Sequence, residues 1–158
     1  MGHITTRDQG SPLGTAEPML ETSTRTFDST WESIHRAESE VLDVARRSGF
    51  RETILERICL ALHEIMINAI VHGNGCDPHK KAVVTISRTP SKLRIEISDE
   101  GDGFDPDHLP DPLSPEGLLK GSGRGVYLAR AFMDEFHVRR EPVGWTTVII
   151  ANLVHSAT

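Results

Sequence analysis

The chain has 158 residues, of which 37% are hydrophobic and 25% charged, and its formal net charge is -6. This length suits one domain whose core needs no disulfide or metal, and the acidic balance argues against a nucleic-acid partner, which would need a basic face. No apolar run approaches the roughly 18 residues of a membrane helix, and no basic start precedes an apolar stretch, so we expect no membrane partner and a cytoplasmic location.

Residues 1–22 are rich in Thr, Ser, Gly and Pro. Such a composition buries too little apolar surface to offset the entropy of ordering, so we expect a flexible N-terminal tail here. The folded domain is then expected over residues 23–155. β-branched residues at 22–27 predict a short strand at its start.

The spacing of apolar residues predicts two helices next, over residues 31–48 and about 51–72. Asp28 or Ser29 would cap the first helix, and a glycine directly follows each of the two. Their core-facing residues are expected to be Ile34, Val41, Leu42, Val44 and Ala45 in the first helix and Ile54, Ile58, Leu62, Ile65 and Ala69 in the second.

The second half of the chain changes to a period of two, which is typical of strands. Residues 100–123 carry many glycines and prolines and are expected to form a long functional loop, followed by a helix over 126–133. The fold class predicted by this order is α+β, a two-layer α/β sandwich with a mostly antiparallel sheet and its helices on one face. The four strands expected here are 82–88 and 93–99, joined by a turn at 89–92, and then 135–140 and 145–153.

Polar residues recur every fourth position on the second helix, at Glu64, Asn68 and His72, which places them on one helix face. A zinc-protease motif is excluded, because Ile67 stands where its second histidine would be. A carboxylate with an amide one turn later suits Mg²⁺, with Asn68 as the ligand and Glu64 placed to deprotonate an attacking hydroxyl or water. A structural carboxylate on a helix is the alternative.

The segment after the second hairpin strand contains Asp99, Gly101 and Gly103. A calcium loop is disfavoured because no glutamate stands at the twelfth position, and a solvated turn stays open. A carboxylate at a strand end could also accept a hydrogen bond from the exocyclic amine of adenine, while the glycines allow close approach.

Three alternating glycines, Gly121, Gly123 and Gly125, precede the third predicted helix. Their N–H groups and the helix start could hold phosphate oxygens, or the segment could be a hinge. It is neither a P-loop nor a dinucleotide-binding fingerprint, because no Gly-Lys-Ser/Thr follows and no early strand precedes it.

Taken together and in order, these three segments resemble the motifs of the GHKL, or Bergerat-fold, ATPases. The short chain and the Phe132-Met-Asp-Glu-Phe ending resemble the anti-sigma-factor serine/threonine-protein kinases in that superfamily. The resemblance implies a Bergerat-type fold that holds ATP and Mg²⁺ beneath a lid over 104–120. The three motifs are Glu64-x-x-x-Asn68-Ala69-x-x-His72-Gly73, Asp99-x-Gly101-x-Gly103 and Gly121-x-Gly123-x-Gly125.

The same resemblance implies a role for each site residue. Glu64 would be the general base, Asn68 the Mg²⁺ ligand and Asp99 the acceptor of the adenine amine. Arg124 would meet phosphate or a partner, unless it is simply a solvated arginine. Thr146 would reach the adenine, although Trp145 stands where the family has glycine. The glycines lining the nucleotide would be Gly101, Gly103, Gly121, Gly123 and Gly125.

The function implied by the resemblance is that of an anti-sigma regulatory factor. Such a protein binds ATP and Mg²⁺, sequesters a sigma factor and phosphorylates a serine on an anti-anti-sigma partner with a STAS-type domain. Members of the family often form homodimers. Two alternatives stay open: a nucleotide-binding partner-switch module without kinase activity, and the detached catalytic domain of a histidine kinase.

Overall fold

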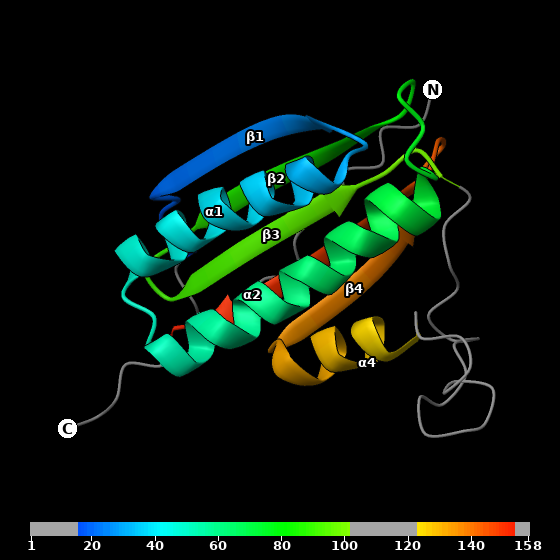
Figure 1. Cartoon of the computed structure of the whole chain (residues 1–158). Coiled ribbons are helices and arrows are strands. Elements are labelled where there is room, and N and C mark those ends of the chain that lie inside the picture. Colours follow the sequence, from blue (N-terminus) through cyan, green and yellow to red (C-terminus); the bar gives the residue numbers. More distant parts are fainter. Residues whose placement is uncertain (1–15, 102–122, 154–158) are drawn as a thin grey trace.

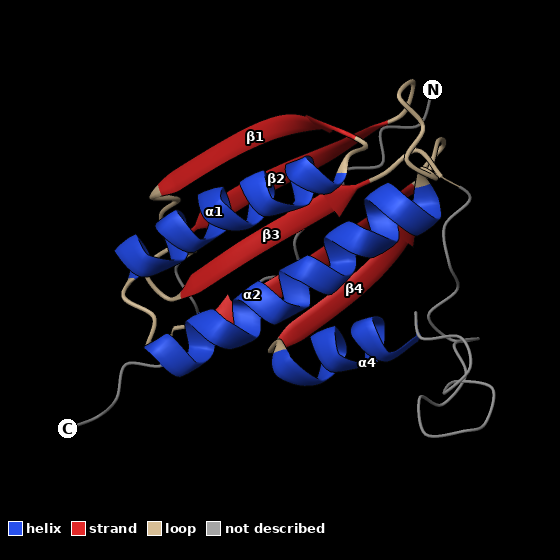
Figure 2. Cartoon of the chain, in the orientation of Figure 1, coloured by secondary structure: helices blue, strands red, loops and turns tan. Residues whose placement is uncertain are grey.

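The computed structural model describes residues 16–101 and 123–153, and within them three α-helices and a π-helical turn cover a five-stranded sheet. Figures 1 and 2 show the helices on one face of the sheet, which confirms the two-layer α+β fold. The elements are β1 (Glu21–Asp28), α1 (Trp31–Ser48), α2 (Glu52–Ile67), η1 (Asn68–Gly73), β2 (Lys81–Arg88), β3 (Lys92–Ser98), α4 (Gly123–Phe132), β4 (Glu135–Arg140) and β5 (Trp145–Asn152).

The strands lie in the order β1-β2-β3-β5-β4, and every ladder between the described strands is antiparallel. The expected hairpin is confirmed, with β2 and β3 joined by the turn at 89–92. β5 pairs with both β3 and β4. Because β5 runs antiparallel to β3, the end of β3 lies beside the start of β5 in the middle of the sheet.

The core lies between the sheet and the helices. Alternation along β2, β3 and β5 turns every second side chain toward the helices, and burying a side chain of this size contributes roughly 1.5–3 kcal/mol. Most predicted helix positions are buried, whereas Leu42 and Ile54 are only partly covered. The inward residues of these strands are Ala82, Val84, Ile86, Leu93, Ile95, Ile97, Ile149 and Ala151.

The first helix has the expected bounds but a different cap. Thr30 caps it, with its hydroxyl oxygen accepting a hydrogen bond from the Ser33 N–H at 3.2 Å. The expected caps are used elsewhere: Asp28 pairs with the Lys81 ammonium at 2.6 Å, and the Ser29 hydroxyl donates to the Lys80 carbonyl at 2.6 Å. Both contacts fasten the start of α1 to the start of β2.

The second helix ends at Gly73 as expected, but its last turn is π-helical. The Asn74 N–H donates to the Ala69 carbonyl at 2.8 Å, five residues back. A π turn holds more residues than an α turn, so His72 does not lie directly above Glu64 and Asn68 on the helix face, although it follows at the same sequence spacing.

The N-terminal end of the described chain is held against the sheet. β1 begins at Glu21, whose carboxylate binds Arg47 at 2.6 Å and Arg88 at 2.9 Å. Before it, Glu17 accepts hydrogen bonds from the hydroxyls of Thr89 and Ser91, each at 2.6 Å. The first strand thus begins two residues before the expected start of the domain at residue 23, and residues 1–15 of the expected tail lie outside the described part.

The remaining differences are small. α4 starts at Gly123, three residues before the expected helix, and β5 ends at Asn152. The expected lid, with Gly103 and Gly121, lies outside the described residues. Within the described ranges no helix is both long and apolar enough to cross a membrane.

Candidate functional site

The end of the second helix and the end of β3 meet at a pair of residues, Gly73 and Asp99. A Cβ added at Gly73 would lie 3.1 Å from the carboxyl carbon of Asp99 and 3.1 Å from its Oδ1. The Asp99 carboxylate therefore faces the helix layer and touches the backbone at the end of η1. A bulkier residue at position 73 would press on this carboxylate.

The turn after β3 is held by close backbone packing. A Cβ on Gly101 would lie 2.5 Å from the Cα of Gly73 and closer still to its carbonyl group, so only glycine fits. The Gly101 N–H donates to Asp99 Oδ1 at 2.9 Å, and the Asp99 N–H donates to the Trp145 carbonyl at 2.9 Å. These contacts give the Asp99 side chain one orientation.

The electrostatics of Asp99 follow from this setting. Burial raises the pKa of Asp99, and the backbone hydrogen bonds with Gly101 and Trp145 partly oppose the rise in pKa. A half-buried carboxylate with free acceptor capacity is suited to receive a hydrogen bond from a ligand amine.

A second contact brings Glu64 to the start of α4. A Cβ on Gly125 would lie 2.7 Å from Cδ of Glu64 and 2.8 Å from its Cβ, with Oε2 closer still. The backbone of the first turn of α4 therefore rests on the Glu64 side chain, and α4 packs along α2 (Figure 1). A helix start beside a carboxylate can hold a ligand that carries both a cation and phosphate groups.

Asn68 lies one turn after Glu64, at the start of η1, and is half-buried. Along the helix, Asn68 lies between two contacts. Glu64 contacts Gly125 on one side of it, and Gly73 contacts Asp99 on the other. No group of three or more His, Cys, Asp or Glu able to hold a metal occurs among the described residues. Mg²⁺ needs few protein oxygens when phosphates and waters complete its shell, so the Glu64–Asn68 pair fits it.

Thr146 is not brought to this site. It pairs with Ser98 across the sheet, its hydroxyl lies 2.7 Å from the Ser98 hydroxyl, and it is 2% exposed. Successive strand residues point to opposite faces, so Thr146 points away from Asp99. Thr147, opposite Ile97, is the buried threonine on the Asp99 face. The alternation of strand side chains, followed back two residues from the inward Ile149, would have predicted Thr147 on this face.

The glycine needed next to Asp99 is Gly144 rather than a residue at position 145. Gly144 has a φ of 79°, and a Cβ there would lie 2.5 Å from the Asp99 carbonyl carbon and 2.8 Å from Glu100 Cα. Trp145 then falls on the inward face, with the Arg140 guanidinium 5.9 Å from its ring. Glycine is therefore required at position 144, where the backbone approaches Asp99 and Glu100 closely.

Four further predicted residues are described only in part or lie outside the described residues. Gly123 is the first residue of α4, and Arg124 follows it in the same turn, but nothing is described of the Arg124 side chain. Gly103 and Gly121 lie outside the described residues. Their predicted contacts with phosphate stay predictions.

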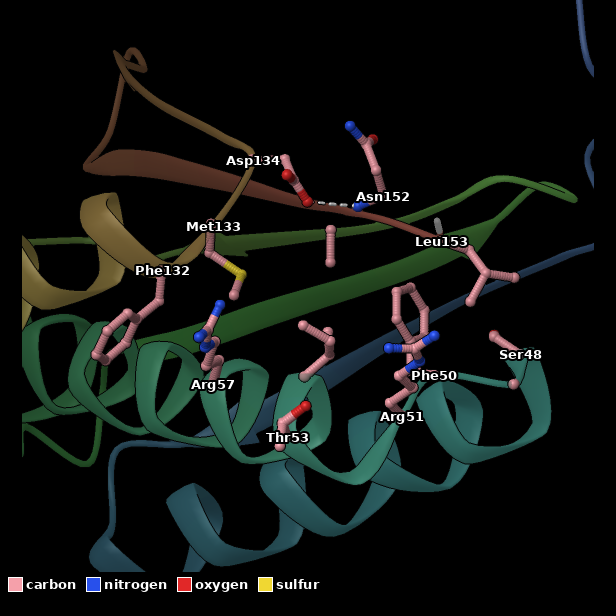
Figure 3. Close-up of a pocket in the computed structure, with 13 residues that line it drawn as sticks. Ser48, Phe50, Arg51, Thr53, Arg57, Phe132, Met133, Asp134, Asn152 and Leu153 are labelled. Atoms are coloured by element: carbon pink, nitrogen blue, oxygen red, sulfur yellow. Dashed lines mark hydrogen bonds between the residues drawn. The ribbon is translucent and has the colours of Figure 1, made fainter. Parts of the chain in front are cut away.

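A cavity of about 640 Å³ lies elsewhere, at the N-terminal end of α2 (Figure 3). Apolar side chains such as Phe50, Ile54 and Met133 line it, together with Arg57, whose guanidinium lies 5.9 Å from the Phe132 ring. None of the predicted site residues that the structure describes lines this cavity. It is therefore separate from the Glu64–Asp99 site.

The protein is a two-layer sandwich with a carboxylate at the end of β3 and glycines packed against that carboxylate. A second carboxylate lies under a helix that begins at a glycine. Together these features define the class of nucleotide-binding ATPase domains. Residues 27–151 match the family described as histidine kinase-like ATPase domain, and the chain belongs to that family. Membership implies that the domain binds ATP.

The chain is also similar to individual proteins with assigned names. The serine-protein kinase RsbW of Bacillus subtilis is 29% identical over 102 residues, covering 61% of this chain and 64% of the relative. The anti-sigma F factor of Shouchella clausii is 35% identical over 100 residues, covering 61% of this chain and 67% of the relative. That of Clostridium perfringens is 32% identical over 100 residues, covering 61% and 70%. The chain thus spans about 64% of the length of the RsbW relatives.

Proposed function

We propose that this protein is an ATP-dependent protein serine kinase of the anti-sigma type. In this proposal it binds ATP with Mg²⁺, holds a sigma factor, and phosphorylates a serine on an anti-anti-sigma partner with a STAS-type domain. The observation that carries the proposal is the contact of Glu64 with Gly125 at the start of α4, one turn from Asn68. The names of the relatives, serine-protein kinase and anti-sigma F factor, support it.

Recognition of the base is assigned to the Asp99 end of the site. The carboxylate accepts a hydrogen bond from the adenine 6-amino group, and Gly73 and Gly101 let the end of η1 and the turn after β3 pack closely around this carboxylate because neither has a side chain. Thr147 lies on the same sheet face and is the threonine we assign to the base in place of Thr146.

The phosphates are assigned to the start of α4. Gly123 and Gly125 lie in the first turn of α4, where backbone N–H groups have no partner within the helix and negative charge is stabilised. Asn68 would supply a side-chain oxygen to Mg²⁺, which neutralises phosphate charge when it is bound. Gly103, Gly121 and Arg124 belong to the same proposal, as contacts to phosphate from the glycine-rich segments.

Proton transfer is assigned to Glu64. Phosphoryl transfer depends mainly on positioning and charge stabilisation, and the remaining task is to accept the proton of the attacking serine hydroxyl. Glu64 is half-buried beneath α4 and is the carboxylate on this helix face. It therefore takes the role of general base.

The wider proposal covers the organisation of the chain. We place the ATPase domain at 23–155 after an N-terminal segment, in the cytoplasm, as a homodimer. The rival function is that of a histidine kinase domain separated from its phosphoacceptor. The relatives of this chain, however, include proteins named serine-protein kinase. His35, the histidine in α1, lies within the domain, with its Nδ1 3.6 Å from a carboxylate oxygen of Glu38.

The test is phosphate transfer from radiolabelled ATP to purified anti-anti-sigma proteins that carry the candidate serine. The parent protein is expected to label a partner on serine, and Glu64→Ala to bind ATP without labelling it. Label on no partner, with ATP bound, would favour a binding module without kinase activity. Label on a histidine would favour the histidine kinase alternative.

A further inference from the structure

A buried polar side chain, Asn74, lies directly behind the Asp99–Gly101 turn and was not among the predicted site residues. It is 2% exposed. Its Nδ2 group donates to the Ser29 hydroxyl oxygen at 3.0 Å and to the Lys81 carbonyl at 3.1 Å, and its Oδ1 accepts a hydrogen bond from the Glu100 N–H at 2.8 Å. Both N–H donors and the oxygen of this planar amide are therefore hydrogen-bonded.

These bonds join four segments that are far apart in the sequence. Ser29 precedes α1, Lys81 starts β2, Glu100 belongs to the turn after β3, and Asn74 itself follows η1. The network is closed by two more bonds, from Ser29 Oγ to the Lys80 carbonyl at 2.6 Å and from the Lys81 N–H to Glu100 Oε2 at 2.6 Å.

The position of Glu100 matters because its two neighbours form the proposed base site. Asp99 precedes it and touches Gly73, and Gly101 follows it and packs on the Gly73 backbone. Neither glycine has a side chain that could anchor the turn. The Asn74 Oδ1 to Glu100 N–H bond fixes the middle of this turn, while the Asn74 N–H to Ala69 bond fixes the η1 side of the same contact.

We infer that Asn74 is a positioning residue for base recognition: it holds the Glu100 backbone so that the Asp99 carboxylate stays aimed at the exocyclic amine of adenine. This inference rests on the proposed function, because it requires a nucleotide whose base lies at Asp99. Asparagine is needed since it presents two donors and an acceptor in one short planar group, which no apolar residue of similar size can do.

The readout is the preference of the protein for ATP over purine riboside triphosphate, which lacks the 6-amino group. In the parent, the hydrogen bond from the amine to a charged acceptor is expected to give about a tenfold preference. In Asn74→Ala the turn loses its anchor, and the two nucleotides are expected to bind with about equal affinity. Affinity for purine riboside triphosphate itself is expected to stay close to that of the parent.

Two control variants separate positioning from stability. Asn74→Asp keeps the oxygen that accepts from Glu100 but buries an acidic group, so it is expected to melt at a lower temperature while keeping most of the preference. Val41→Ala removes buried methyl groups from the core of α1, away from the turn. It is expected to lower the melting temperature and leave the preference unchanged.

If the parent prefers ATP and Asn74→Ala prefers ATP equally strongly, the inference about Asn74 is wrong while the assignment of the base to Asp99 stands. An Asn74→Asp protein that loses the preference as completely as Asn74→Ala would overturn the inference as well. A parent that binds both nucleotides equally would instead refute the assignment of the base to Asp99. Should Asn74→Ala fail to fold, Ser29→Ala, which removes one partner of Nδ2, is expected to weaken the preference partly, and an unchanged preference there would also overturn the inference.

Discussion

Gly125→Ala tests whether the start of α4 sets the position of Glu64. The new Cβ would lie 2.7 Å from Cδ and 2.8 Å from Cβ of Glu64, whereas ordinary contact begins at 3.4 Å. Either the carboxylate or the start of α4 must therefore move by about 1 Å. A misplacement of that size can lower a rate by about 100-fold, while binding away from the reacting group is affected much less.

The variant is also expected to cost some stability. Alanine is favoured over glycine in a helix by about 1 kcal/mol, and the carboxyl end of Glu64 can rotate away, but its Cβ at 2.8 Å cannot, so the start of α4 must shift as well. We therefore expect a lower melting temperature, ATP affinity reduced much less than the rate, and serine phosphorylation reduced by about 100-fold.

The assay combines thermal melting, calorimetric ATP titration and single-turnover phosphate transfer on the same preparations. In a Glu64→Ala background, Gly125→Ala should cause no further loss of transfer, because the displaced group is already absent. Transfer at the parent rate by Gly125→Ala alone would refute the assignment of Glu64 as a base held by α4.

Three further predictions concern single side chains. Thr147→Val should weaken ATP binding in a calorimetric titration, whereas Thr146→Val should cost about 1–3 kcal/mol of unfolding free energy with unchanged binding, since it loses hydrogen bonds to Ser98 and Glu141; the reverse result would favour Thr146 as the residue that contacts the base. Asn68→Ala should abolish the dependence of ATP affinity on Mg²⁺, and identical magnesium titrations would remove Asn68 as ligand. Because burial raises the pKa of Asp99, the folded state holds this proton more tightly than the unfolded chain, so ionisation of Asp99 lowers stability as pH rises through its titration. Asp99→Asn should therefore gain unfolding free energy relative to the parent as the pH rises above the ordinary aspartate pKa of about 4, and a parallel pH dependence of the two proteins would contradict the raised pKa.

Most of the fold could be predicted from the sequence because its elements are strongly periodic. The apolar spacing of α1 and α2 and the alternation in β2 and β3 each give one consistent face, and the structure has these elements within a few residues of the expected bounds. The cap of α1 was missed because Asp28, Ser29 and Thr30 are all good caps. The choice among them depends on Lys80 and Lys81, which lie far away in the sequence.

The site could be predicted in part for the same reason. Glu64, Asn68 and Asp99 lie at element ends that the pattern located correctly. The close approach of Gly144 to Asp99 and the inward position of Thr147 depend on the register between β3 and β5, which periodicity alone leaves open. The π turn at the end of the second helix is likewise not visible in the apolar spacing. Asn74 was missed because a polar residue after a helix looks like an ordinary turn residue until its three partners are brought together.

The most direct measurement of the central claim is a crystal structure with Mg²⁺ and a non-hydrolysable ATP analogue. The account predicts the adenine amine at the Asp99 carboxylate, the metal at Asn68 and the terminal phosphate beside Glu64 and the start of α4. Nucleotide density in the cavity at the other end of α2, or a base turned away from Asp99, would contradict it.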